Sequence, residues 1–305
     1  MGRADDPSEL GQFIPLHYHY NMLNDTVRMR GFKSAIDYAV HPGGKVLELG
    51  GGTGVLSYFA MQKAAKVWCV ERNPKLVAKA REILCLNPFG DKIEVIEADA
   101  FNYLPPEPVD VVICEMIHVA LVREKQIPVI TSFKQRYLTR FGNPLPQFVP
   151  EAVIQAVQPV EHDFNFEGYY APAPLYQDPY SPHPKTRELA APVVYQLLAY
   201  NESMPERCVW NGVTNAAEDG VMNGLRFITK NILAVLQEKQ TAIDWHSQYL
   251  ILPLARPLKV AQGDIIQMGF SYEAGASLDD LEGSLVTAVQ PFSRYCIPPA
   301  SAGAA

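Results

Sequence analysis

Two patterns of apolar and polar positions divide the chain near its middle. In the first half, short continuous apolar runs alternate with longer helix-prone stretches. Continuous apolar runs indicate strands buried on both faces, and strands that alternate with helices are typical of βαβ units around a parallel sheet. The stretches between the runs predict helices at 56–66 and 73–87. The runs themselves predict strands at 45–50, 66–71, 92–99 and 109–115.

The pattern changes at the proline-rich stretch 142–152. Beyond it lie short alternating runs such as VVYQLLAYN and QYLILPLARPLKV. A period of two indicates antiparallel strands with one face on the core, so we expect a second, β-rich domain. Inside it, residues 169–186 are crowded with proline and tyrosine and cannot form a regular helix or a central strand. We expect either a disordered loop or an ordered arm that packs its tyrosines on another surface, such as a second subunit.

Composition narrows the class of protein. The chain has 305 residues, 48% hydrophobic and 19% charged, so a sizeable core can form in one large domain or two. No apolar run approaches the ~20 residues that span a bilayer, and the N-terminus lacks the apolar segment of a signal peptide, so we expect a cytoplasmic protein that does not enter a membrane. The net charge of −7 argues against non-specific nucleic-acid binding and is compatible with a basic or small-molecule substrate.

The cysteines and histidines give no sign of a metal site. The five cysteines are an odd number, are widely spread and include no CxxC pair, which indicates neither a disulfide framework nor a zinc site. Cys69 and Cys114 stand in apolar runs and are expected to be buried structural thiols. His17 and His19 lie close together but have no carboxylate or cysteine companion nearby, so we expect no bound metal.

A glycine-rich stretch, LELGGGTGVLS (47–57), follows the first predicted strand and opens a helix. Glycine suits positions where the backbone turns sharply or approaches a ligand closely. The spacing departs from the GxGxxG dinucleotide fingerprint, because Val55 takes the place of the third glycine. Glu48 stands just before the glycines, where a carboxylate would repel a pyrophosphate but suit a cofactor with a sulfonium and an ammonium group. The glycines of the GxGxG pattern are Gly50, Gly52 and Gly54.

Two further acids stand at the ends of the next strands. Glu71 closes the second predicted strand, where it can accept hydrogen bonds from ribose hydroxyls, and Asp99 closes the third, where it can meet an adenine amine. This ordered set over residues 45–115 resembles the class I S-adenosylmethionine-dependent methyltransferases, which implies a Rossmann-like α/β fold and S-adenosylmethionine as the cofactor. The simpler alternative, in which Glu48 is a satisfied strand-end acid and the glycines only turn the chain, explains fewer of these positions.

Two glutamates follow the fourth strand in CEMIHVALVRE (114–124). Ligands bind beyond the carboxyl ends of parallel strands, so Glu115 should face the reacting end of the cofactor. Here the chain resembles the protein arginine methyltransferases, which carry two glutamates at the spacing of Glu115 and Glu124 on a hairpin-like loop and use both to hold the substrate guanidinium. MLNDTVR (22–28) resembles that family's helix before the first strand, which implies that Arg28 pairs with the cofactor carboxylate.

Elementary chemistry explains why such an acceptor needs two carboxylates. A guanidinium is a poor nucleophile, because its pKa is above ~12 and its lone pairs are delocalised. Two carboxylates can hold it by charge-assisted, bidentate hydrogen bonds and draw positive charge toward the far nitrogens. One nitrogen is then better able to attack a methyl group, and positioning supplies much of the rate. The predicted reaction is methyl transfer from S-adenosylmethionine to a guanidinium nitrogen of arginine in a protein or peptide, with one glutamate as proton acceptor.

The acceptor side departs from the family pattern. The family's Thr-His-Trp loop reads Ile243-Asp244-Trp245, and Asp244 is predicted to keep the pocket selective for a cation. Met116 stands where the family has tryptophan, and the family's tyrosine-rich N-terminal helix is not evident. These departures leave two alternatives open. One is a methyltransferase for small-molecule amines or guanidines, and the other is a non-catalytic scaffold that binds the cofactor without turnover.

The two glutamates and the histidine between them also have structural interpretations. Glu115 could be a strand-end acid paired with a nearby basic residue, and Glu124 could be a solvated residue beside Arg123 and Lys125. His118 could act as a general base, but a structural or exposed histidine is the favoured interpretation.

The resemblance extends over roughly residues 19–290 and implies a two-domain organisation. The family works as a dimer through an arm in its barrel domain, so we expect a homodimer with a cationic acceptor and no nucleic-acid or membrane partner. The predicted segments are a helical lid (1–32), a Rossmann-like cofactor-binding domain (33–147), a β-barrel-like domain (148–293) with the arm at 165–190, and a flexible tail (294–305).

Overall fold

The computed structural model describes residue 14 and residues 16–292. Its first part is built on a five-stranded sheet in which every neighbouring pair is parallel, in the order β3-β2-β1-β4-β5. The predicted Rossmann-like α/β core is therefore confirmed. The strands are β1 (Lys45–Leu49), β2 (Lys66–Glu71), β3 (Glu94–Glu97), β4 (Val111–Cys114) and β5 (Gln147–Val149).

The strand order changes direction at β1. β2 pairs with one edge of β1, and β4 pairs with the other edge. Such a switch point leaves a crevice beyond the carboxyl ends of the diverging strands, where ligands bind in open α/β sheets. The glycine loop (50–54) leaves β1, and the glutamate loop (115–124) leaves β4. The two loops therefore meet at this crevice.

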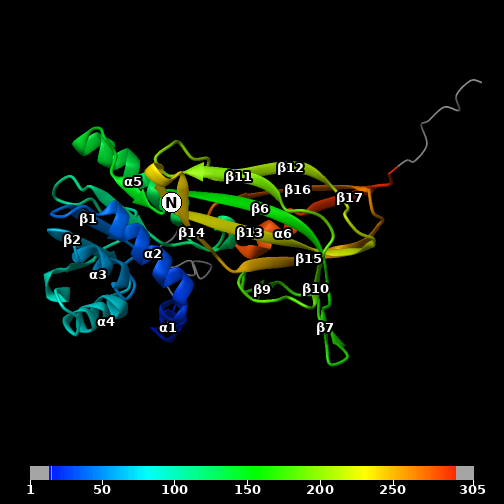
Figure 1. The fold of residues 1–305 in the computed structure, drawn as a ribbon, viewed down its shortest axis with the longest axis horizontal. Coiled ribbons are helices and arrows are strands. Elements are labelled where there is room, and N and C mark those ends of the chain that lie inside the picture. Colours follow the sequence, from blue (N-terminus) through cyan, green and yellow to red (C-terminus); the bar gives the residue numbers. More distant parts are fainter. Residues whose placement is uncertain (1–13, 15, 293–305) are drawn as a thin grey trace, which may run out of the picture.

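Helices cover both faces of the parallel sheet (Figure 1). Alternate residues of β1 separate the two layers, since Val46 packs with α2, α3 and α4 while Leu47 packs with α5. The sequence did not predict α5, because Pro128 in its first turn and the buried polar residues Gln126 and Lys134 interrupt its apolar periodicity. The helices are α1 (Leu16–Asn24), α2 (Thr26–Ala39), α3 (Val55–Met61), α4 (Pro74–Cys85) and α5 (Gln126–Phe141).

The second part consists of antiparallel sheets, as the alternating pattern predicted. A seven-stranded sheet has the path β10-β6-β13-β15-β9, with β11 added to β6 and β14 added to β13. A separate three-stranded sheet has the order β12-β16-β17. The main strands are β6 (Ala152–His162), β11 (Val193–Ala199), β12 (Arg207–Asn215), β13 (Gly220–Leu236), β14 (Thr241–His246), β15 (Tyr249–Val260), β16 (Ile265–Glu273) and β17 (Val286–Gln290), with helix α6 (Leu278–Gly283) before β17.

The second part, expected to be β-barrel-like, is not a closed barrel. Within the described residues no hydrogen-bonded ladder joins the seven-stranded sheet to the three-stranded sheet, so the strands do not close into a barrel. β11 pairs with β6 and β12 pairs with β16, although the two strands follow each other in the chain. The two sheets instead share one apolar cluster, which includes Phe227 of β13 and Phe270 of β16 with ring centroids 5.2 Å apart.

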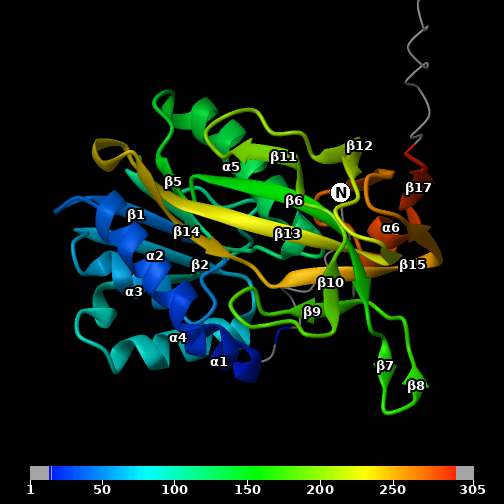
Figure 2. The same cartoon turned by 45° about the vertical axis from the view of Figure 1, so that its right-hand side comes forward.

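The proline- and tyrosine-rich segment is an ordered arm. It begins with the hairpin of β7 (Asn165–Phe166) and β8 (Tyr169–Tyr170), which projects from the body in Figure 2. It then returns as β9 (Leu175–Gln177) and β10 (Thr186–Glu188), which pair with β15 and β6 of the same chain. The arm therefore has an exposed tip, where Tyr169 is 73% exposed, and a base that packs on its own sheet.

The two parts share a core where α2 meets the β13–β14 hairpin. Phe32 and Trp245 are buried with ring centroids 6.0 Å apart, and Leu233 joins the same cluster. This packing fixes the position of α2 against the second part. No helix among the described residues is long and apolar enough to cross a membrane. Residues 1–13 of the predicted lid and the predicted tail (294–305) lie outside the described residues.

Candidate functional site

A cavity of about 1080 Å³ opens at the switch point of the parallel sheet. The loops that leave β1 and β4 form its floor, and α1 with the start of α2 forms one wall. The opposite wall comes from the second part, through the arm and the turn between β14 and β15. The predicted site residues that line the cavity are Arg28, Glu48, Gly50, Gly52, Glu71, Asp99, Glu115 and Glu124.

The glycine loop and Glu71 form one rigid unit at the cavity floor. The backbone N–H of Gly52 donates to Glu71 Oε2 at 2.9 Å, and the N–H of Asn73 donates to Glu71 Oε1 at 2.8 Å. Gly50 has a φ of 80°, which a residue with a side chain adopts only with strain. A Cβ on Gly50 would lie 2.8 Å from Met116 Cγ. Met116, which replaces the family's tryptophan, therefore packs directly on the glycine loop.

Glu48 lies deep in the cavity, whereas Asp99 lies nearer its surface. Glu48 is 2% exposed, and its Oε2 accepts from the backbone N–H of Ser57 at 2.9 Å and from the Ser57 hydroxyl. Burial raises the pKa of Glu48 to about 7. Asp99 is partly exposed and accepts a hydrogen bond from the Phe101 N–H at 2.9 Å. Its Oδ2 also forms an ion pair with Arg72 Nη1 at 3.8 Å. Gly54 starts α3 behind the loop, against Leu84, and is not part of the cavity lining.

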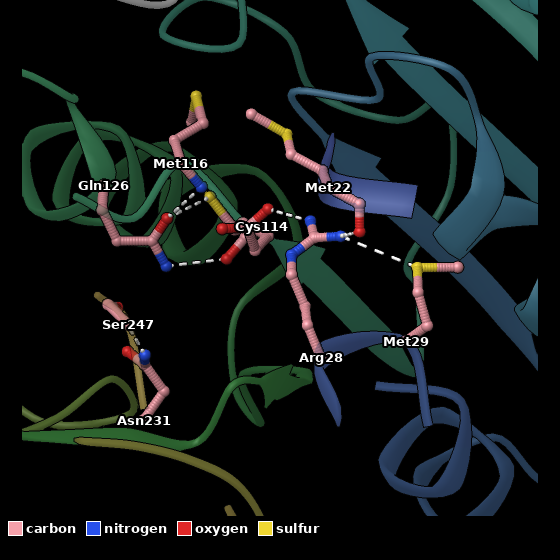
Figure 3. Close-up of polar contacts among 9 residues, drawn as sticks. Met22, Arg28, Met29, Cys114, Met116, Gln126, Asn231 and Ser247 are labelled. Atoms are coloured by element: carbon pink, nitrogen blue, oxygen red, sulfur yellow. Dashed lines mark hydrogen bonds and ion pairs between the residues drawn. The ribbon is translucent and has the colours of Figure 1, made fainter. Parts of the chain in front are cut away.

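Arg28, labelled in Figure 3, forms a buried ion pair with Glu115 in the cavity. Arg28 is 6% exposed, and its guanidinium carbon lies 5.4 Å from the ring centroid of Phe32 and 5.9 Å from that of Trp245. Its Nη2 donates to Glu115 Oε2. In this structure Glu115 is therefore paired with a basic residue, which was one of the interpretations that the sequence left open.

Gln126 fixes the start of the glutamate loop. Its side chain is fully buried at the beginning of α5, where Nε2 donates to the Cys114 carbonyl at 2.7 Å and Oε1 accepts from the Met116 N–H at 2.9 Å (Figure 3). These bonds clamp the backbone on both sides of Glu115. Because Gln126 belongs to a helix that the sequence did not predict, its role was not foreseen.

The rest of the glutamate loop is also anchored. The Ala120 N–H donates to Thr229 Oγ1 at 2.8 Å, and the Arg123 N–H donates to the Ala276 carbonyl at 2.7 Å. Ala120, Leu121 and Arg123 all have positive φ. Backbone conformations of this kind persist only where the surrounding structure holds them in place, and they concentrate at functional sites.

Glu124 lies where a carboxylate charge is unfavourable. Its pKa is raised to about 8, chiefly by burial and also by the charge of Glu115, while Arg28 and Arg123 act in the opposite direction. An added cation would stabilise the charged form of this carboxyl group, because its attraction offsets both the cost of burial and the repulsion from Glu115. The interpretation of Glu124 as a solvated surface residue does not fit its place in the cavity.

Asp244 is the predicted catalytic residue that lies outside the cavity lining. It stands on β14 with its side chain 35% exposed and forms an ion pair with Lys230 at 3.0 Å. Successive residues of a strand point to opposite faces, so Asp244 points outward while Trp245 is buried beside the cavity. The prediction that Asp244 makes the pocket selective for a cation is therefore corrected.

His19 is a cavity residue whose place the sequence did not reveal. A Cβ on Gly52 would lie 3.1 Å from His19 Cε1, so the imidazole rests on the glycine loop. Burial lowers the pKa of His19, and the charges of Glu71, Arg28 and Glu115 act on it. Its Nε2 is buried and has no hydrogen-bond partner among the described residues. One signal in the sequence could have indicated its place: His19 and Met22 are three positions apart, so a helix puts both on one face, which is the cavity face of α1.

The cavity suits a cofactor with a nucleoside and an amino-acid end. Glu71 and Asp99 offer carboxylate oxygens to hydroxyl and amine donors, and the buried Nε2 of His19 offers an unused hydrogen-bonding group above the glycine loop. Arg28 offers a cation to a carboxylate at the opposite end. These donors and acceptors match the functional groups of S-adenosylmethionine.

Comparisons with known sequences agree with this assignment. The methyltransferase-domain family matches residues 46–138. An uncharacterised protein of Methanocaldococcus jannaschii is 30% identical over 270 residues, which cover 88% of this chain and 96% of that protein. Protein arginine N-methyltransferase 6 of Xenopus laevis is 33% identical over 47% of this chain and 43% of its own length. Arginine N(omega)-methyltransferase of Streptomyces achromogenes subsp. streptozoticus is 31% identical over 47% of this chain and 41% of its own length.

Solved structures share the two-part fold. A Trypanosoma brucei protein arginine methyltransferase 1 enzyme–prozyme heterotetrameric complex with AdoHcy aligns with a TM-score of 0.69 at 17% identity, over 90% of this chain and 98% of that chain. Arabidopsis thaliana protein arginine methyltransferase 10 aligns with a TM-score of 0.70 at 19% identity, over 85% of this chain and 88% of that chain. The chain therefore belongs to the class I methyltransferases that use S-adenosylmethionine as cofactor, and it resembles the protein arginine methyltransferases.

Proposed function

We propose that this enzyme transfers a methyl group to a guanidinium nitrogen of arginine in a peptide or protein. The observation that carries the proposal is the position of Glu115 and Glu124, which line one cavity with the glycine loop. Burial and the charge of Glu115 both disfavour the ionised form of Glu124 there. A planar cation with several N–H donors relieves that repulsion and matches two carboxylates geometrically.

Each residue has a distinct part in this proposal. S-adenosylmethionine, when bound, supplies an electrophilic methyl group on its sulfonium. Glu71 and Asp99 orient the nucleoside end, and Arg28 holds the carboxylate end. Glu115 and Glu124 hold the guanidinium so that one nitrogen faces the methyl group, and Glu124 accepts the proton that the methylated nitrogen loses. A carboxyl with a pKa of about 8 is a suitable proton acceptor near neutral pH.

The Arg28–Glu115 ion pair implies an exchange of partners during binding. Glu115 Oε2 accepts from Arg28 in this structure, and an acceptor guanidinium that binds Glu115 must compete with this bond. A cofactor carboxylate offers Arg28 a second anionic partner. Binding of the cofactor therefore prepares Glu115 for the acceptor, which favours an order with the cofactor first.

A small guanidino compound is the second candidate acceptor. The arm covers part of the cavity with Tyr176 and Tyr180, and a peptide must pass this wall to reach the two glutamates. The name of the Streptomyces relative specifies arginine and does not mention a protein substrate. A non-catalytic scaffold is the third candidate, and it predicts cofactor binding without turnover.

Transfer of labelled methyl groups distinguishes these candidates. The acceptors are a glycine- and arginine-rich peptide, the same peptide with lysine at every arginine, free L-arginine, and a set of small primary amines. We expect methylarginine in the first peptide and no label in the lysine peptide. Label in L-arginine or in the amines alone would replace the protein substrate by a small molecule, and AdoHcy binding without any labelled product would favour the scaffold.

The pH dependence of turnover gives a separate test of Glu124. Holding a cation requires the charged carboxylate, so kcat/KM for the peptide is expected to rise with pH until the pKa of Glu124, about 8, is passed. The acceptor guanidinium stays protonated over this range, because its pKa is above ~12. The exposed variant Glu218→Gln should show the same profile as the wild type. A flat profile between about pH 6.5 and 8.5 would contradict the assignment of Glu124.

The same raised pKa has a consequence for stability. The folded protein keeps a proton on Glu124 that the unfolded chain releases above its ordinary pKa of about 4.5, so this group lowers the free energy of unfolding as pH rises from about 4.5 to 8. Glu124→Gln removes this contribution. Denaturant unfolding at about pH 6 and pH 9 should therefore show a smaller loss of stability in Glu124→Gln than in the wild type.

The arm supports a homodimer. The tip of the β7–β8 hairpin exposes Phe166, Tyr169 and Tyr170, at 49%, 73% and 59%. Aromatic side chains grouped at the end of a projecting hairpin are typical of residues that insert into a partner surface. We propose that this tip contacts a second copy of the chain.

A further inference from the structure

The arm continues beyond its hairpin as a strap, residues 175–180, along the cavity wall. Its first residues form β9, which pairs with β15 through Leu250 opposite Tyr176. Its last residue, Tyr180, accepts a hydrogen bond at Oη from the His246 N–H at 3.1 Å. Both ends of the strap are thus tied to the second part of the molecule. Tyr176 lies at the first of these ends and is part of the cavity lining.

Tyr176 contacts the glutamate loop at one point, the imidazole of His118. Tyr176 Oη and His118 Nε2 are 3.0 Å apart, and the two rings meet edge to face with centroids 5.6 Å apart. This contact joins residues 58 positions apart in the sequence. Among the described residues, no other side-chain hydrogen bond joins the strap to the glutamate loop.

The hydrogen-bond pattern fixes the tautomer of His118. Its Nδ1 is 3.0 Å from the Val119 carbonyl oxygen, which can only accept, so Nδ1 carries the proton. Nε2 therefore presents its lone pair and accepts from the Tyr176 hydroxyl. Burial lowers the pKa of His118 to about 4, so the ring stays neutral near pH 7 and keeps this arrangement. An imidazole that is neutral and hydrogen-bonded at both nitrogens stabilises the loop and does not serve as a base.

His118 occupies the middle of the loop that carries Glu115 and Glu124. Its carbonyl accepts from the Leu121 N–H at 2.9 Å, at the start of the short helical turn Val119–Leu121. The backbone anchors at Ala120 and Arg123 hold the outer half of the loop, and Gln126 holds its first residues. The inner, cavity-facing side is held through the His118 side chain.

We propose that Tyr176 is a positioning residue for methyl transfer, which holds the glutamate loop in the arrangement that receives the acceptor through its hydrogen bond to His118. The role in transfer rests on the proposed function. The hold on the loop itself does not, since it concerns only contacts within the chain. The strap thereby links the arm to the acceptor side of the active site.

Tyr176→Phe removes the hydroxyl and keeps the ring. Loss of one hydrogen bond to a neutral partner corresponds to about a threefold to tenfold change, so kcat/KM for the arginine-rich peptide should fall by about that factor. AdoHcy affinity, measured by calorimetry, should stay unchanged, because Tyr176 acts on the acceptor side. Tyr38→Phe is the matched control, since Tyr38 is 48% exposed on α2 and lies outside the cavity lining. An unchanged kcat/KM in Tyr176→Phe would overturn the role in transfer.

Two readouts test the hold on the loop without any acceptor. Nitrogen-15 spectra of the histidine rings should show His118 as the Nδ1–H tautomer in the wild type and a changed Nε2 shift in Tyr176→Phe. Amide exchange at Ala120 and Leu121 should become about threefold to tenfold faster in Tyr176→Phe and not in Tyr38→Phe. Unchanged shifts and exchange rates would overturn the proposal even if transfer is observed. If the wild type methylates nothing, the proposed function fails, and these two readouts still decide whether Tyr176 holds the loop.

Discussion

Glu115→Gln is expected to slow methyl transfer by roughly 10²–10³-fold, the effect of removing one preorganised electrostatic group from an active site. Glutamine keeps the shape of the side chain but cannot neutralise a guanidinium or accept from it with both ends. Glu115 is mostly buried, with 13% of its side chain exposed, so solvent does not replace the lost charge. The acceptor is then bound by Glu124 alone and is held less firmly for attack.

Cofactor binding separates this outcome from misfolding. Glu115→Gln leaves Arg28 without its anionic partner, so Arg28 should bind the cofactor carboxylate at least as well as in the wild type. We therefore expect AdoHcy affinity that is equal or higher, together with lost turnover. Glu218→Gln, an exposed position between β12 and β13, is the matched control and should behave as the wild type. Transfer at more than a tenth of the wild-type rate would contradict the role of Glu115.

The part of the cavity around the glycine loop could be predicted from the sequence because its residues stand at fixed places along the chain. Each acid stands at or near the end of an apolar strand, and the carboxyl ends of parallel strands meet at one edge of the sheet. Glu71 illustrates this, since its position at the end of β2 brings it to the glycine loop without any information from elsewhere in the fold. The glutamate loop was predictable for the same reason, because Glu115 directly follows β4.

The rest of the cavity depended on contacts between segments that are distant in the sequence, and a single sequence does not display such contacts. Arg28 and Glu115 are 87 positions apart, and their pairing follows from how α2 packs against the end of β4. Asp244 was assigned from a motif register, but strand alternation turns it toward Lys230 and solvent. The strap contact with His118 required the arm to fold back on its own sheet, whereas the sequence suggested packing on another surface such as a second subunit.

Arg28→Met is expected to lower both the free energy of unfolding and the affinity for the cofactor. Methionine fits among Met22, Met29 and the rings of Phe32 and Trp245, so the loss is mainly one of charge. Removing one partner of a buried ion pair leaves the other charge uncompensated and lowers the free energy of unfolding by about 3–5 kcal/mol. AdoHcy affinity should fall by roughly 10- to 100-fold, the equivalent of one charge-assisted hydrogen bond. Arg30→Met, two positions along the same helix and exposed, is the matched control for calorimetry and denaturant unfolding.

Combining Arg28→Met with Glu115→Gln distinguishes loss of the pair from loss of the arginine itself. If the instability of Arg28→Met comes from the unpaired Glu115 carboxylate, glutamine at position 115 removes that charge, and the double variant should be more stable than Arg28→Met alone. Cofactor affinity should not recover, because it depends on Arg28 directly. A double variant as unstable as the sum of the two single variants would show that the ion pair does not couple these residues. Recovered stability with lost affinity would identify Arg28 as the shared partner of Glu115 and the cofactor carboxylate, which is the condition for cofactor binding to release Glu115 to the acceptor.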